Sequence, residues 1–179
     1  MMLLKIYLRL MIKSRLAREK AENVLHMFGI SEAPIDVDDI ASKLGFKIAY
    51  TELSDKVSAA IKIDGDRKAI IVNSKHSKSR QRFSLAHELG HYLSGHEDFD
   101  DEKRVFIDPH KKYLNPQFRQ EEEADEFAAE LLMPESLLKI NVLEDKLGLS
   151  ELATKYEVSE QAMTIQLVNL KLPFNQSNK

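Results

Sequence analysis

The chain has 179 residues, 43% of them hydrophobic, which is enough for one ordinary domain with its own core and unlike the composition of a disordered protein. Its 26 basic and 29 acidic residues give a net charge of −3, so the overall charge offers no attraction to nucleic acid or another polyanion. The absence of cysteine excludes disulfides, thiolate metal ligands and a cysteine nucleophile, and it suits a reducing compartment such as the cytoplasm.

The first twelve residues, MMLLKIYLRLMI, are apolar but contain Lys5 and Arg9. This segment is too short for a membrane span, which needs about 20 apolar residues. Its charges lie within the apolar run rather than before it, unlike those of a secretion signal. Apolar residues at the even positions from 4 to 12 predict a half-buried strand, and a true start at Met11 is an alternative. We therefore expect a cytoplasmic protein without a membrane anchor.

The order of the predicted elements is typical of an α+β fold rather than of alternating βαβ units. Helices are predicted over 14–28, 36–44, 83–95 and 119–133 and through the last 45 residues. Strands are predicted over 46–50 and in a hairpin, 58–73, whose two apolar runs are joined by Gly65 and Asp66. Residues 96–118 show no regular period.

The predicted helix over 83–95 contains the pattern H-E-x-x-H, formed by His87, Glu88 and His91. Residues four apart lie on one face of a helix, so both imidazoles can reach one cation at about 2.0–2.1 Å. Glu88 follows the first histidine directly and is therefore placed to take a proton from a water on the same zinc ion. Gly90 costs helix stability, which a close approach of another backbone or a substrate would explain.

A third ligand is expected on the helix over 119–133, in the stretch EEEADEFAAELLMP. Glu121 and Asp125 are four apart, so Glu121 can bind the metal while Asp125 accepts the free ring N–H of a ligand histidine. Glu122 points about 100° away from Glu121, and Glu123 turns to the side opposite Asp125, so both are weaker candidates. Two histidines and one glutamate leave a fourth position open, as in a catalytic zinc site.

Other polar residues near these motifs have less definite roles. His96 is one residue short of the third histidine in H-E-x-x-H-x-x-G-x-x-H, so it is interpreted as solvated or as a neighbour of a ligand. His76, His110 and Tyr113 are candidates for stabilising an oxyanion, and the sequence does not choose among them. The basic residues of the segment 75–82 are interpreted as a solvated loop, with attraction of an acidic substrate segment as the alternative.

The sequence resembles the ImmA/IrrE family of metallo-endopeptidases over about residues 16–172. The motifs that carry the resemblance are RQRFSLAHELGH (80–91) and ADEFAAELLMP (124–134). The resemblance implies a zincin-like (gluzincin-like) domain, one zinc ion held by His87, His91 and Glu121, and Glu88 as the general base. It also implies cytoplasmic cleavage of a helix-turn-helix repressor encoded nearby, in a phage, mobile-element, stress-response or toxin–antitoxin-like setting.

The last 45 residues are expected to form a helical extension, 135–179, packed on a metallopeptidase domain, 1–134. The segment 150–170 has the rhythm of a helix-turn-helix. Direct DNA binding is not expected from it, because residues 159–170 contain no lysine or arginine to neutralise phosphates. The alternative function is a catalytically idle module that binds DNA or a repressor through these helices.

Overall fold

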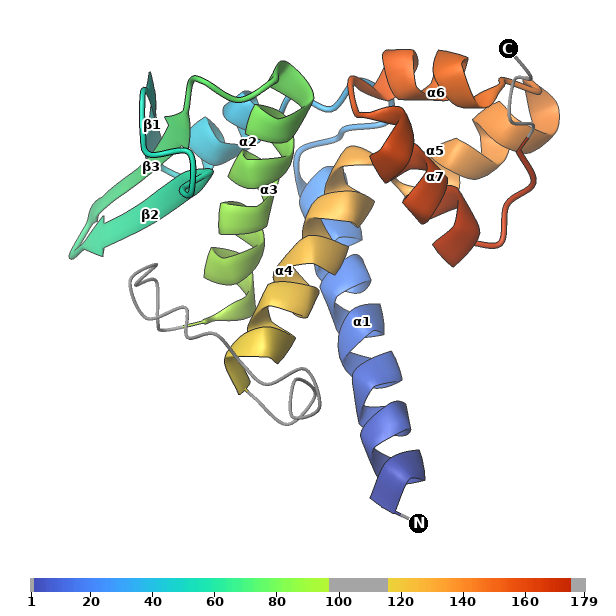
Figure 1. Cartoon of the computed structure of the whole chain (residues 1–179), viewed down its shortest axis with the longest axis horizontal. Helices are drawn as coiled ribbons and strands as arrows, with labels where there is room; N and C mark the ends of the chain where they lie inside the picture. Colours follow the sequence, from blue (N-terminus) through green and yellow to red (C-terminus); the bar gives the residue numbers. More distant parts are fainter. Residues whose placement is uncertain (1, 97–115, 175–179) are drawn as a thin grey trace.

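The computed structural model describes residues 2–96 and 116–174, with side chains described for 15–96 and 118–174. It has an α+β architecture, as predicted: a small mixed sheet lies against one side of a group of helices (Figure 1). The predicted strands are present as β1 (Phe46–Thr51), β2 (Ala59–Asp64) and β3 (Arg67–Asn73). Strand β3 lies between the other two, antiparallel to β2 and parallel to β1.

The sheet forms because β2 and β3 make a tight hairpin, with Gly65 in the left-handed conformation (φ 57°) at the turn. Ile61 of β2 and Ile48 of β1 both lie opposite Ile70 of β3, and Ile70 is fully buried. Strands β1 and β2 are therefore the two edges of this three-stranded sheet, and each leaves one row of backbone groups unpaired within it.

The helices of the described chain are α1 (Met2–Met27), α2 (Val37–Lys43), α3 (Lys78–Ser94), α4 (Pro116–Leu132), α5 (Glu135–Lys139), α6 (Leu149–Tyr156) and α7 (Glu160–Asn169), with a π-helical turn, η3 (Ile140–Glu144). Helix α4 packs against α3 on one side and α1 on the other (Figure 1). Phe127, Ala128, Leu131 and Leu132 of α4 are fully buried, as their helical spacing predicts. Among the described residues, no helix is long and apolar enough to span a membrane.

The prediction of a strand over residues 4–12 is wrong, because this segment is the first part of α1. The even positions 4, 8 and 12 are also four apart, so the same alternation fits one stripe of a helix. The segment is rich in leucine, methionine, lysine and arginine, which favour helix. These preferences explain why it forms a helix although its apolar spacing also fits a strand.

Helices α6 and α7 reproduce the predicted helix-turn-helix rhythm. Ser159 is the N-cap residue of α7, and its Oγ accepts a hydrogen bond from the backbone N–H of Ala162 at 3.1 Å. Glu157, in the turn, has the left-handed conformation (φ 53°). The hydroxyl of Tyr156 donates to Asn141 Oδ1 at 2.9 Å, which ties the end of α6 to η3.

A buried carboxylate, Glu130, joins α4 to the helices that follow it. Its side chain is 1% exposed and accepts hydrogen bonds from the backbone N–H of Glu135 at 2.8 Å and from Gln166 Nε2 at 3.4 Å. Burial disfavours the ionised form and raises the pKa of Glu130 to about 7, with a further contribution from the charge of Glu22.

Replacement of this carboxylate should change how stability depends on pH. Glu130 is ionised above about pH 4.5 when unfolded but only above about pH 7 when folded, so the native protein loses stability as pH rises through this window. A shift of this size corresponds to roughly 3 kcal/mol. Glu130→Gln is neutral at every pH and should remove this slope, as measured by urea unfolding of metal-free protein from pH 4.5 to 8. A wild-type slope in the variant would contradict the assignment.

Candidate metal centre

Helix α3 carries the H-E-x-x-H motif and is capped at both ends by residues next to it in the sequence. Ser77 is the N-cap residue, and its Oγ accepts a hydrogen bond from the backbone N–H of Arg80 at 3.4 Å. The helix therefore begins at Lys78, five residues earlier than predicted. Gly95 ends it in the left-handed conformation, with φ 68° and ψ 32°. Glu88 and His91 are each 6% exposed, so this face of the helix is turned inward.

The structure brings His87, His91 and Glu121 together across the α3–α4 contact, with one ligand atom from each within 4.8 Å of the others. The Nε2 atoms of the two histidines are 2.9 Å apart. Glu121 Oε2 lies 3.4 Å from His87 Nε2, and its Oε1 lies 3.4 Å from His91 Nε2. Two imidazoles from one helix and a carboxylate from the next therefore converge on one point.

These separations fit a tetrahedral metal. Ligand atoms about 2.0–2.1 Å from a tetrahedral ion lie roughly 3.3 Å from one another. Each carboxylate oxygen of Glu121 lies 3.4 Å from the Nε2 atom of one histidine, close to this value, and the 2.9 Å between the imidazoles needs only a small adjustment. The group formed by these three side chains can therefore hold a metal ion.

The other ring nitrogen of His87, Nδ1, lies 2.8 Å from Asp125 Oδ1. Burial lowers the pKa of His87, but hydrogen bonds to Asp125 and Glu121 outweigh this effect and raise it to about 9. In the metal-free protein this favours the protonated ring, whose Nδ1 faces Asp125 Oδ1 and whose Nε2 lies 2.9 Å from His91 Nε2 and 3.4 Å from Glu121 Oε2. A proton on Nε2 of His87 would occupy the position of the metal ion, so metal binding would release it.

The other ring nitrogen of His91, Nδ1, faces His96 rather than a carboxylate, at 2.9 Å from His96 Nδ1. The second nitrogen of His96, Nε2, lies 3.3 Å from Glu123 Oε2. His96 is 6% exposed, so of the two interpretations offered by the sequence it is the neighbour of a candidate ligand and not a solvated residue. The contact between Glu123 and His96 was not predicted, because its residues are 27 positions apart.

Gly90 lies at a close approach between α3 and α4. A Cβ atom at this position would lie 3.1 Å from the Cα and from the carbonyl oxygen of Ala124, and 3.1 Å from Phe127 Cδ1. Two of these three atoms belong to the backbone of α4 and cannot turn away. The expectation that a backbone approaches Gly90 is thus confirmed, and this approach sets the distance of Glu121 from the histidines.

Gly90→Ala should therefore destabilise the protein although alanine favours helix by about 1 kcal/mol. Overpacking of a close contact costs about 1–3 kcal/mol, and here it would push α4 away from α3. We expect a net loss of unfolding free energy and a weaker affinity for metal, measured by urea unfolding and by competition with a chelator. A variant as stable as the wild type, with unchanged metal affinity, would show that this contact does not set the geometry.

Of the three residues proposed as oxyanion stabilisers, His76 is the one that the structure describes, and it is not brought to this centre. His76 lies before the start of α3, more than two helical turns from His87, or roughly 14 Å along the helix axis. His110 and Tyr113 lie outside the described residues. The prediction for His76 therefore has no geometric support, and the other two stay predictions.

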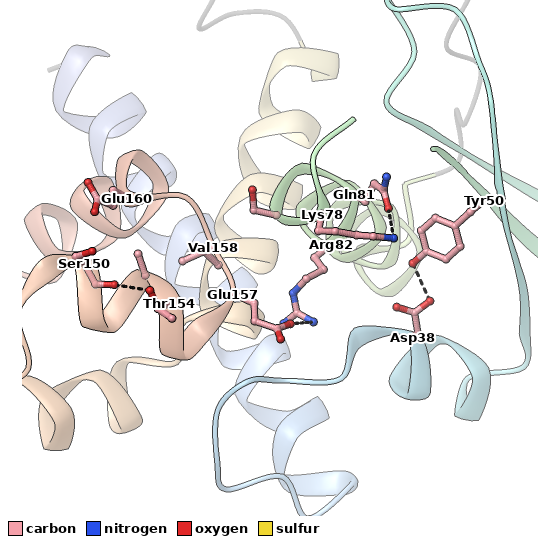
Figure 2. A pocket seen from close by; sticks show the side chains of 12 residues that line it. Asp38, Tyr50, Lys78, Gln81, Arg82, Ser150, Thr154, Glu157, Val158 and Glu160 are labelled. Atoms are coloured by element: carbon pink, nitrogen blue, oxygen red, sulfur yellow. Dashed lines mark hydrogen bonds and ion pairs between the residues drawn. The ribbon is translucent and has the colours of Figure 1, made fainter. Parts of the chain in front are cut away.

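A groove of about 770 Å³ lies at the opposite end of α3, between that helix, α2 and the α6–α7 pair (Figure 2). Arg82 bridges it: its Nη1 lies 3.1 Å from Glu157 Oε2, and its Nη2 donates to the backbone oxygen of Ile35 at 2.8 Å. The interpretation of the segment 75–82 as a solvated loop is thus wrong from Lys78 on, because these residues belong to α3, and the side chain of Arg82 is only 15% exposed. The groove is lined by two basic residues (Lys78 and Arg82) and three acidic ones (Asp38, Glu157 and Glu160), so its charges largely offset one another.

The sequence matches the model of a peptidase family, in agreement with a metal-binding group of this kind. The model of the family described as the IrrE N-terminal-like domain, a peptidase family (M78), matches residues 41–167, which include the sheet, α3 and α4. A search of the curated proteins finds none that matches the chain. The resemblance inferred from the motifs is confirmed, since the matched range covers more than half of the 179 residues. The chain belongs to the IrrE N-terminal-like domain family of metallopeptidases, the ImmA/IrrE family.

Proposed function

We propose that this chain is a zinc-dependent endopeptidase of the cytoplasm that cleaves a helix-turn-helix transcriptional repressor encoded nearby. The observation that carries the proposal is the convergence of His87, His91 and Glu121, in a chain of a metallopeptidase family. Two imidazoles and one carboxylate with an open fourth position are the donor set of a catalytic zinc site. A structural zinc site would instead require a fourth protein ligand.

In this proposal, His87, His91 and Glu121 hold one zinc ion and Asp125 fixes the ring of His87. Zinc, when bound, would polarise the scissile carbonyl and favour ionisation of the attacking water. Glu88, next to His87 and largely buried, takes the proton of that water and later passes it to the nitrogen of the leaving amine. Gln in place of Glu88 would keep the shape of the side chain but could not accept the proton.

The substrate is held, we propose, as an extended segment along the edge strand β2. Within the part of the chain that the structure describes, this strand pairs with β3 on one side only, and it packs near α3, which carries the histidines (Figure 1). An extended peptide can add to such an edge through backbone hydrogen bonds. This mode suits an endopeptidase, because it requires no free end of the substrate.

The α6–α7 pair would contact the protein substrate rather than DNA. Helix α7 contains no lysine or arginine, and it exposes Ile165 (54%) and Val168 (59%). Exposed apolar side chains suit contact with a protein, whereas binding to DNA depends on neutralising phosphates.

The direct test is to incubate the purified protein with the repressor encoded by the neighbouring gene, with and without a zinc chelator. Cleavage of one bond, lost on chelation and restored by added zinc, is the expected result. Cleavage that continues in the presence of excess chelator would refute zinc dependence. Intact repressor together with a zinc-loaded protein would refute the choice of substrate but not the metal site.

A further inference from the structure

We propose that His96 and Glu123 form a positioning pair that holds the candidate ligand His91 in the tautomer and orientation needed for metal binding. The inference rests on the proposed metal site and extends it to two residues that contact no metal. The pair is joined to His91 by two contacts: His96 Nδ1 is 2.9 Å from His91 Nδ1, and His96 Nε2 is 3.3 Å from Glu123 Oε2.

The arrangement of protons follows from the contacts. A histidine that binds a metal through Nε2 must offer a lone pair there, so His91 carries its hydrogen on Nδ1. Two ring nitrogens 2.9 Å apart share one hydrogen, and His96 Nδ1 is therefore the acceptor. The hydrogen of His96 is then on Nε2, where Glu123 accepts it. The carboxylate of Glu123 thus fixes the tautomer of His96, and His96 fixes that of His91.

The end of α3 places His96 for this task. Gly95 takes the left-handed conformation, and its N–H bonds to the carbonyl of Tyr92 at 3.1 Å. The next N–H, that of His96, bonds back to the carbonyl of His91 at 3.1 Å. These two bonds form the Schellman motif, which folds the residue after glycine back over the last turn of the helix. His96 therefore lies beside Nδ1 of His91 and not beside Nε2, where the metal would be.

The two candidate ligand histidines are supported in different ways. His87 Nδ1 contacts Asp125 directly at 2.8 Å, and the side chain of Asp125 is 59% exposed. The support of His91 is enclosed, because the side chains of His96 and Glu123 are 6% and 14% exposed. Water can replace Asp125 more readily than it can replace His96. We therefore expect the metal affinity to depend more on His96 than on Asp125.

The test compares three substitutions for their effect on zinc affinity, measured by competition with a chromophoric chelator. His96→Leu removes the acceptor and should weaken zinc binding by about 10- to 100-fold. His96→Asn places its Oδ1 where Nδ1 of histidine stood and should restore affinity to within about fivefold of the wild type. Asp125→Ala should weaken binding less than His96→Leu. Circular dichroism of the metal-free proteins establishes that each variant is folded.

A double-mutant cycle tests whether the pair acts as one chain of contacts. Glu123→Leu should weaken zinc binding in the wild-type background and have little further effect in His96→Leu. The visible absorption spectrum of the cobalt-substituted protein should change in His96→Leu and Glu123→Leu and resemble the wild type in His96→Asn.

Three results would overturn the inference: wild-type affinity in His96→Leu, equal losses in His96→Asn and His96→Leu, or fully additive losses in the cycle. Should His96→Leu fail to fold, His96→Asn and Glu123→Leu still decide the question. A wild-type protein that binds no zinc would end the proposed function and this inference together. Zinc binding that is insensitive to His96 would end the inference alone.

Discussion

Glu88→Gln is expected to lower the rate of peptide hydrolysis by at least about a hundredfold, because a positioned general base contributes about 10²–10⁴-fold. Glu88 follows the candidate ligand His87 on α3 and is 6% exposed, so its carboxylate is held on the inward face of the helix. The amide of glutamine has nearly the same shape but cannot take a proton from water. The initial rate of repressor cleavage measures the effect.

The same variant should bind zinc as the wild type does, because Glu88 is not in the group of candidate ligands. Glu126→Gln is a matched control: it makes the same chemical change at a carboxylate of α4 that pairs with Arg18 at 2.9 Å. We expect this control to retain activity. Hydrolysis by Glu88→Gln within about tenfold of the wild-type rate would exclude Glu88 as the base.

Glu121→Ala should weaken zinc binding by more than about a hundredfold, which is the upper range for losing a residue that only supports a ligand. Glu121 supplies both of its oxygens to the centre, each 3.4 Å from the Nε2 atom of a histidine. Its removal leaves two imidazoles on one helix, with no partner from α4 in the group. Elemental analysis after gel filtration and chelator competition measure zinc content and affinity.

Glu122→Ala is the matched control for this change, since it removes the next carboxylate along α4, which points about 100° away from Glu121. It should retain one zinc per chain. If Glu122→Ala loses zinc while Glu121→Ala keeps it, the carboxylate ligand has been assigned to the wrong residue. Equal zinc content in both variants and the wild type would mean that α4 supplies no ligand.

Much of the candidate site could be predicted because its residues follow helical spacing. His87 and His91 are four apart, as are Glu121 and Asp125, so each pair shares a face once its helix forms. Gly90 and Ala124 then allow the two helices to approach closely. The α+β architecture, the hairpin and the α6–α7 pair could be predicted from periodicity, glycine turns and a serine cap for the same reason, since these signals are local.

The remaining features depend on contacts between distant parts of the chain. His96 contacts His91 because the chain turns back at Gly95, which has the left-handed conformation. The spacing of residues in a sequence motif does not indicate such a turn. Glu123 meets His96 only because α4 packs on α3. Arg82 is drawn inward by Ile35 and Glu157, which lie 47 and 75 positions away. The first part of α1, residues 4–12, was mistaken for a strand because its apolar spacing fits both periods, whereas the helix predicted from residue 14 onward is present.

The arrangement of the metal centre can be tested most directly by anomalous X-ray diffraction at the zinc absorption edge on crystals of the zinc-loaded protein. We expect one peak bonded to the Nε2 atoms of His87 and His91 and to the carboxylate of Glu121, at about 2.0–2.2 Å from each. We also expect that no fourth side chain is bound to the zinc ion. A peak elsewhere, or one bonded to four protein side chains, would contradict the assignment of a catalytic zinc site.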